Sequence, residues 1–343
     1  MRRYFKNCFV SQLFICLVVS CSTNVDEWTG YSRVDHIIVS RLPLDSSKLE
    51  PSIDEQNNDS LVTTRATTTG TGQNIGILFE HTDTLGIFPD GGYQIPFVLP
   101  LKEGETASGV LIEAQGWMTK DGIMYSTYLP FNFYNRNYNR IPWDYGKPQI
   151  QSVNTNHEHL GEHIFEATDT TRADNGTFHA SLRNMACILR FQCYAPTNAD
   201  YRKVVLAIDY NGFPQKGYFD LFDVHKNANG KHTPESQPFI AENNTNFVYV
   251  LIKSAPLATK NVLTAYLVVP PIDLRGKTIT AYVWDSNGNC YSQTMTLDNS
   301  DSRNWERGTV RGIAFTGLAL TTTPSAYVTP YDSEVGLGGV ALE

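Results

Sequence analysis

Residues 177–195 read TFHASLRNMACILRFQCYA, and this stretch decides the fold class. Apolar side chains occupy every second position from Met185 to Cys193, whereas Arg190 and Gln192 fall on the opposite parity. A period of two is typical of a β-strand, because neighbouring side chains of a strand point to opposite faces of the sheet. The stretch therefore predicts a strand with one face in a core.

Short apolar runs of the same kind recur after Gly70, with turn residues between them, which is the pattern of an all-β protein. The Asn-Gly pair within residues 285–289 predicts a tight hairpin. Residues 135–176 are rich in Asn, Pro and Gly and are expected to be a loop. Residues 34–42, VDHIIVSRL, form an apolar island in an otherwise polar region and are expected to be able to form a strand. No amphipathic helix of three turns is expected, so the sequence predicts antiparallel β-sandwiches.

Length and charge bound the function. A chain of 343 residues suggests two domains, with a boundary near residue 175. The formal net charge is -8 and the sequence has no concentrated basic region, which argues against a nucleic-acid partner.

The N-terminus has the features of an export signal. Arg2, Arg3 and Lys6 precede the apolar stretch FICLVVS, which is too short to span a bilayer. The motif VVSC, which ends at Cys21, resembles a bacterial lipobox, in which the cysteine becomes lipidated; a plain secretory signal with a chance cysteine is the alternative. An acyl chain on Cys21 would hold the protein on a membrane without spanning it.

Three cysteines follow the predicted lipidation site: Cys187, Cys193 and Cys290. An odd number does not indicate a disulfide framework. Six residues of strand would separate Cys187 from Cys193 by about 20 Å, far beyond the reach of a disulfide. We expect buried free thiols.

The order of several motifs resembles the fimbrillins of Bacteroides-type bacteria, the Mfa-like or type V pilin group. These motifs are the lipobox, a polar leader, TRATTTG (64–70), LGIFPDGG (85–92), YLPFN (128–132) and EATDTTRADNGTFHASLRNMACILRF (166–191). The resemblance spans residues 18 to 318, and LRGKTITAYVW (274–284) and GTVRGIAF (308–315) match the closing strands of that group only loosely.

The resemblance implies an all-β fold of two antiparallel Greek-key β-sandwich (transthyretin-like) domains in tandem. It divides the chain into a lipoprotein signal peptide (1–20), a leader with a blocking strand (21–65), two sandwiches (66–175 and 176–320) and a tail (321–343). In such proteins an arginine-specific protease removes the leader, and a strand donated by the next subunit fills the opened groove, which is β-augmentation. The implied partners are other fimbrial subunits, that protease, the lipoprotein export machinery and the outer membrane, at the cell surface, with no cofactor and no enzymatic activity.

The predicted cleavage site lies between Arg65 and Ala66. This arginine interrupts a threonine-rich, polar stretch, and exposed flexible backbone is what a protease needs. Arg33 and Arg41 are competing sites, and an ordinary solvated linker arginine is the simplest alternative.

Two other features suggest different functions. His159-Leu160-Gly161-Glu162-His163 fits the H-x-x-E-H pattern of inverted zincins. Its surroundings predict a loop and not the helix that zinc chemistry needs, so His159 and His163 remain only weak metal-ligand candidates. The alternative function is a monomeric surface lipoprotein whose loop aromatics, Tyr138, Trp143 and Tyr145, bind a glycan or host ligand.

The tail has the length of a donor strand, but its apolar residues are interrupted by Pro324, Pro330, Gly336, Gly338 and Gly339. A stalk subunit, a tip or accessory subunit and an anchor therefore all remain open.

Overall fold

The computed structural model describes residues 36–47, 49, 53, 68–69, 75–89, 92–113, 124–168, 171–221 and 239–337. The described chain is built almost wholly of strands, with four short 3-10 helices, η1 to η4, so the predicted all-β class is confirmed. No helix in these residues is both long enough and apolar enough to cross a membrane.

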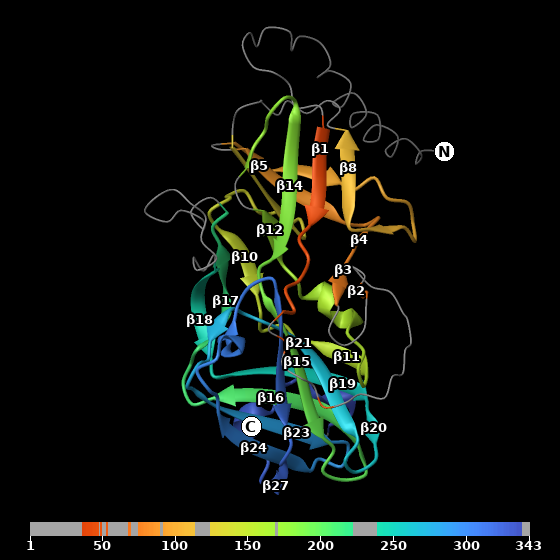
Figure 1. Ribbon diagram of the computed structural model, residues 1–343, viewed down its shortest axis with the longest axis vertical. Helices are drawn as coiled ribbons and strands as arrows, with labels where there is room; N and C mark the ends of the chain where they lie inside the picture. The colour runs from red at the N-terminus through yellow and green to blue at the C-terminus, as the bar shows by residue number, and fades with distance from the viewer. Residues whose placement is uncertain are drawn as a thin grey trace, which may run out of the picture.

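The upper part of the molecule in Figure 1 is one large sheet. Its strand order is β6-β5-β9-β12-β14-β1-β8, and β13 pairs with β9. The strands are β1 (His36–Arg41), β5 (Thr84–Pro89), β6 (Ile95–Val98), β8 (Gly109–Glu113), β9 (Met124–Leu129), β12 (Glu166–Thr168), β13 (Thr171–Arg172) and β14 (Thr177–Asn184). Two small ladders accompany it: β2 (Thr68–Thr69) with β3 (Gly76–Ile77), and β4 (Phe79–Glu80) with β7 (Thr106–Ala107).

The lower part is a sandwich of two sheets around the largest core cluster. One sheet has the order β11-β19-β16-β23-β24-β27, with β20 beside β16, and the other has the order β21-β15-β26. Their strands are β11 (Ile150–Val153), β15 (Cys187–Tyr194), β16 (Ala199–Ile208), β19 (Phe247–Ser254), β20 (Pro256–Leu257), β21 (Val262–Val269), β23 (Thr278–Asp285), β24 (Cys290–Thr296), β26 (Thr309–Phe315) and β27 (Ala319–Thr321). The predicted hairpin joins β23 to β24, and Asp285 N donates to Asn289 O.

Smaller elements complete the described chain. A third sheet is made of β10 (Ile141–Asp144), β17 (Phe213–Phe219) and β18 (Phe239–Thr245). The last ladder pairs β22 (Ile272–Asp273) with β25 (Asn304–Trp305). The 3-10 helices are η1 (Glu158–Glu162), η2 (Asp301–Arg303), η3 (Ser325–Tyr327) and η4 (Asp332–Val335).

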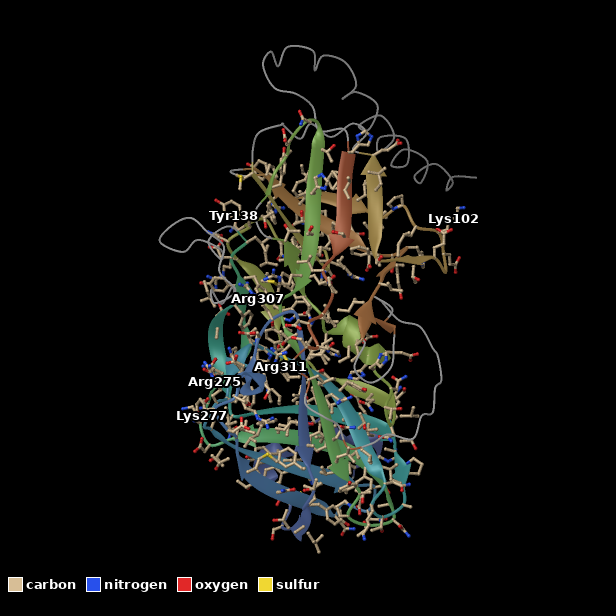
Figure 2. All side chains as sticks on the ribbon, viewed as in Figure 1. Lys102, Tyr138, Arg275, Lys277, Arg307 and Arg311 are labelled. Atoms are coloured by element: carbon tan, nitrogen blue, oxygen red, sulfur yellow. The ribbon has the colours of Figure 1, made fainter. Side chains whose placement is uncertain are left out.

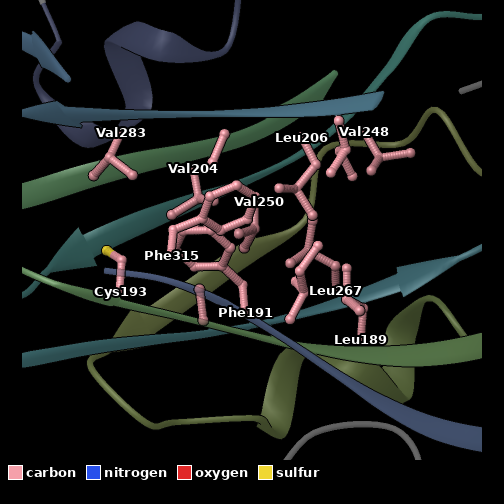
Figure 3. Close-up of a cluster of buried hydrophobic side chains, with 14 of the residues drawn as sticks. Leu189, Phe191, Cys193, Val204, Leu206, Val248, Val250, Leu267, Val283 and Phe315 are labelled. Carbon is pink, nitrogen blue, oxygen red and sulfur yellow. The ribbon is translucent and has the colours of Figure 1, made fainter. Parts of the chain in front are cut away.

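The stretch 177–195 forms two strands in different sheets. Asn184 ends β14, and its side-chain oxygen accepts a hydrogen bond from Ala186 N at 3.0 Å. Such a local side-chain bond competes with the ladder and turns the chain. In β15, Leu189 and Phe191 face the sandwich core, where Phe191 stacks on Phe315 (Figure 3).

The opposite face of β15 is also covered. Arg190 and Gln192 point away from the sandwich core, as predicted, but each is only 2% exposed. The predicted free thiols of Cys187, Cys193 and Cys290 are confirmed as free and buried, and burial raises the pKa of each.

One expectation differs from the structure. Residues 135–176 were expected to be a loop, but they contain four short strands, β10, β11, β12 and β13, and the 3-10 helix η1. Each of these strands pairs within a sheet. Pro142 sits in β10, at the edge of its sheet, where a missing N–H is tolerated. The ladders are mostly antiparallel, but β1–β14, β11–β19 and β15–β26 are parallel.

Sheet membership is interleaved along the sequence. β14 follows the predicted boundary near residue 175 and yet pairs with β12 and β1 in the first sheet. β10 and β11 precede the boundary and pair with β17 and β19. The division into domains at residue 175 therefore stays a prediction.

The tail folds back onto its own sandwich. The ammonium of Lys203, a residue of β16 that is 1% exposed, donates to Tyr327 O at 2.6 Å and to Asp332 Oδ1 at 2.7 Å. Burial lowers the pKa of Lys203, and the Asp332 carboxylate acts against that shift. Val335 and Leu337 pack beside the same strand.

Breaking this buried ion pair should loosen the tail. We expect Asp332→Asn to lower the free energy of unfolding by about 3 kcal/mol, because it leaves the Lys203 ammonium buried without its counter-charge. Denaturant unfolding measures this change. The exposed neighbour Glu334 is the matched control, and Glu334→Gln should stay within about 0.5 kcal/mol of the wild type. Equal effects of the two substitutions would contradict the docking of the tail.

Candidate functional site

The strand β1 lies inside the first sheet, between β14 and β8, although the sequence around it is polar (Figure 1). All six residues from His36 to Arg41 pair in parallel with residues 177–182 of β14. Residues 36–40 pair on the other side, antiparallel, with residues 109–113 of β8. We call the gap that β1 fills the slot, and residues 36–53, of which 36–47, 49 and 53 are described, the leader segment.

Alternate residues of β1 enter the core. Ile37 and Val39 are 0% exposed and pack in a cluster with residues of β5, β6, β9 and β14, whereas Ile38 faces outward and is 39% exposed. Burying an aliphatic side chain of this size contributes roughly 1.5–3 kcal/mol. The apolar island of the sequence therefore fills two positions of the first core, and a strand within it is confirmed over His36–Arg41.

Arg41, the last residue of β1, lies on the same inward face as Ile37 and Val39 but carries a charge. Its side chain is 4% exposed, Nε donates to Glu166 Oε2 at 2.8 Å, and Nη2 lies 3.7 Å from Asp83 Oδ2. The guanidinium carbon lies 4.1 Å from the centre of the Phe79 ring, a cation–π contact. Burial raises the pKa of Glu166, and the Arg41 charge and hydrogen bond act against that shift.

The leader segment also contacts the second half of the molecule. Leu42 N still donates to Leu182 O of β14 in the first sheet, whereas Asp45 N donates to Gly308 O and Val310 N donates to Asp45 O. Asp45 forms a parallel β-bridge with Thr309 of β26. In the sequence Thr309 lies between Arg307 and Arg311, and Figure 2 labels both arginines near the middle of the molecule. Leu44 and Leu49 pack on a cluster that covers the outer face of β15. The leader segment thus runs from the first sheet onto the sheet of β26.

The predicted processing residues lie mostly outside the described part. Cys21, Arg33, Arg65 and Ala66 are outside the described residues, so their roles stay predictions. The competing site Arg41 is described, and it is buried in a sheet strand with its guanidinium paired. A protease needs exposed, extended backbone, so Arg41 is inaccessible to it in the folded chain.

The first histidine of the His159–His163 motif makes a hydrogen bond within the protein. η1 contains His159, whose Nε2 lies 3.0 Å from Tyr266 O and donates to it, so that nitrogen is not free to bind a metal in this arrangement. The His159 and His163 rings are 6.4 Å apart. Within the described residues, no group of three or more His, Cys, Asp or Glu side chains is placed to hold a metal ion.

The aromatic residues of the alternative function are packing residues. Tyr138, Trp143 and Tyr145 are partly buried and contact the cluster around Phe165, and Figure 2 labels Tyr138. Trp143 lies 5.2 Å from Phe165 between ring centres, and the Tyr145 hydroxyl donates to Met185 O. The most exposed aromatics lie elsewhere: Tyr93, Phe133 and Tyr134 are 86%, 75% and 87% exposed.

The sequence analysis missed Glu166 and Asp83, the acids that face Arg41. They lie 125 and 42 positions along the chain from it, as 166 - 41 and 83 - 41, and Glu166 falls in the stretch expected to be a loop. The available indication was an arginine at an inward position of an apolar strand, because a buried guanidinium requires a buried acid.

Solved structures of bacterial surface proteins are similar to this chain. A candidate cell adhesion protein from Bacteroides ovatus has a TM-score of 0.45 and 13% identity, covering 86% of this chain and 97% of that chain. Another, from Bacteroides uniformis, has a TM-score of 0.44 and 9% identity, covering 71% and 91%. The tip fimbrial protein Mfa3 from Porphyromonas gingivalis, with a C-terminal truncation, has a TM-score of 0.37 and 8% identity, covering 85% and 96%. No family model and no curated protein matches the sequence.

These neighbours are cell-adhesion and fimbrial proteins of the Bacteroidales, the group that the sequence resembles. Their low identities and TM-scores carry no argument about what this chain binds. The inferences about binding below rest on the slot and its contacts.

Two adjacent isoleucines test the placement of β1. We expect Ile37→Ala to lower the free energy of unfolding by about 2–4 kcal/mol, because it removes a fully buried side chain. The matched control is Ile38→Ala, at a half-exposed position, which should cost less than about 1 kcal/mol. Denaturant unfolding measures both, and a reversed order of the two effects would show that β1 has the opposite face inward.

Stability should fall on mild acidification because of His159, the histidine within η1. Burial, with the nearby His163, lowers the pKa of His159 to about 3, below its ordinary value of 6.5. The unfolded state therefore takes up a proton below pH 6.5 that the folded state does not, so stability is lost as the pH falls. We expect a slope of up to about 1.4 kcal/mol per pH unit from this group between pH 6 and 4.

Unfolding curves at several pH values measure the slope. His159→Gln should reduce the slope without abolishing it, because burial also lowers the pKa of His163, to about 4. A wild-type stability that does not vary over this range would refute the burial of a neutral His159.

Proposed function

We propose that this protein is a structural subunit of cell-surface fimbriae that is exported as a lipoprotein, activated by proteolysis and assembled by strand exchange. The observation that supports it best is the place of β1, a strand from the leader that fills an interior position of the first sheet. Cys21 would carry the lipid, and an arginine-specific protease would cut between Arg65 and Ala66. Adhesion would be the task of the assembled fimbria.

Cleavage changes how strongly the leader is held. In the intact chain the leader segment is tethered to the slot, and a tether of this kind keeps its effective concentration in the millimolar range. After a cut near residue 65 the same contacts must hold the leader as a separate chain. A competing strand at high local concentration can then replace it.

The vacated slot would favour a new strand for two reasons. β14 and β8 would each expose a row of unpaired N–H and C=O groups, which template the pairing of an added strand. Loss of the Ile37 and Val39 side chains would also expose the first core to water. While it occupies the slot, β1 prevents premature assembly.

The partners follow from this mechanism: other fimbrial subunits for strand exchange, the arginine-specific protease, the lipoprotein export machinery and the outer membrane. A tip or accessory role is supported by the tail, whose residues 325–337 fold onto their own sandwich and are not extended for donation.

The processed N-terminus tests the proposal. Arg65→Ala should block removal of the leader and hold the protein as a monomer, because the tether to β1 stays intact. Arg33→Ala is the matched control and should be processed as the wild type is. Intact-mass measurement and N-terminal sequencing of surface protein should place the mature N-terminus at Ala66. SDS-resistant ladders on gels report assembly.

A mature chain that begins upstream of residue 36 and still assembles would contradict the release of β1. A chain that begins between residues 54 and 74, but not at Ala66, would move the cleavage site and leave the release of β1 in place.

A further inference from the structure

We propose that the slot selects its incoming strand by charge: it admits a strand that places an arginine or lysine against Glu166, and that strand comes from a different protein, not from the tail of a second copy of this chain. This inference rests on the proposed function, since the slot opens only when the leader segment leaves.

The first support is the position of Glu166. This residue begins β12, which is separated from β1 by β14, and it is 2% exposed. Its carboxylate accepts a hydrogen bond from Arg41 Nε at 2.8 Å, and no other cation of the described chain lies within 4 Å of it. Removal of β1 would leave the Glu166 carboxylate without its counter-charge, and a replacement strand would bury that carboxylate again, which is strongly unfavourable unless a cation pairs with it. An uncharged replacement strand would not correct this.

The surroundings of Glu166 are those of a cation pocket. Asp83 supplies a second acid, 3.7 Å from Arg41 Nη2, and also accepts a hydrogen bond from Glu80 N, which fixes its carboxylate. Phe79 presents its ring face to the guanidinium carbon at 4.1 Å. Two acids and a ring face, from the β4–β5 segment and from β12, thus converge on one position of the slot.

The pair is suited to fixing register. Arg41 Nη1 and Nη2 are buried without hydrogen bonds, so the pair is not arranged for greatest stability. Buried charges of this kind contribute little net stability and are best known for setting register. A shift of one residue would turn Ile37 and Val39 to the outer face. A shift of two would place an uncharged residue of the leader at Glu166.

The slot therefore reads a short pattern: apolar, any, apolar, any, basic, in the direction parallel to β14. The leader meets it with Ile37, Val39 and Arg41. Residues 319–343 do not, because they contain no lysine or arginine. Charge complementarity thus argues for a donor with a basic residue, and a strand from another subunit meets that need where the tail of a second copy cannot.

The test uses the full chain with a site-specific protease sequence placed within residues 54–67, cut after folding. Fluorescent peptides then compete for the slot: residues 34–44 (VDHIIVSRLPL), the same peptide with Arg41→Met, and the tail peptide 319–343. We expect the arginine peptide to bind at least about 100-fold more tightly than the other two, which corresponds to about 3 kcal/mol. In the Glu166→Gln protein this preference should fall below about tenfold.

The outcomes are distinct. Equal binding of the arginine and methionine peptides by the wild type would overturn the charge selection and leave strand exchange standing. Tight binding of the tail peptide would make the donor a second copy. If no peptide enters the slot, the proposed function fails, and this inference fails with it.

A second measurement needs no exchange. In the uncut chain, Arg41→Met should lower the denaturant midpoint, and adding Glu166→Gln should restore part of the loss, because the unpaired charge is then gone. An Arg41→Met chain that unfolds like the wild type would by itself overturn the charge selection.

Discussion

An interior strand of a sheet must be paired on both sides, and in this protein the strand β1, residues 36–41, is paired in this way between β14 and β8. β1 joins β14 to β8 and contributes Ile37 and Val39 to the first core. Its Arg41 forms an ion pair with Glu166. The leader segment then continues to β26 and helps to cover the outer face of β15. Because so much of the first sheet depends on one short segment, its release would change the molecule from closed to receptive.

The burial of the Arg41 side chain separates it from the predicted cleavage residue Arg65. Arg41 and Arg65 are the same residue type, and both were candidates for cleavage on sequence grounds. Arg41 is fixed in a strand against Glu166, Asp83 and Phe79, where a protease cannot reach its backbone. In our proposal the same contacts make Arg41 the residue that sets the register of β1. The cleavage assigned to Arg65 and the anchoring done by Arg41 are therefore complementary parts of one proposal.

Local patterns predicted most of the fold, and long-range pairing was what they missed. The alternation in β15, the hairpin of residues 285–289 and the strand of the apolar island were all visible as short-range periodicity. The strands of residues 141–168 were not, because they are three or four residues long, and β10 and β11 are held by partners far along the chain. The Arg41–Glu166 pair was missed for the same reason: its spacing of 125 positions leaves no local signature. The parallel pairings of β1 and β15 likewise depend on chain topology and not on residue pattern.

Locking β1 in place tests the central claim most directly. Ile38 and Leu111 are register partners on the outer face, 39% and 56% exposed, at a separation typical of strand neighbours that a disulfide can bridge. With both changed to cysteine, Ile38→Cys and Leu111→Cys, the oxidised protein should remain monomeric after cleavage between residues 54 and 67, and reduction should restore assembly. Assembly of the oxidised, cleaved protein at the rate of the reduced one would contradict the release of the leader strand.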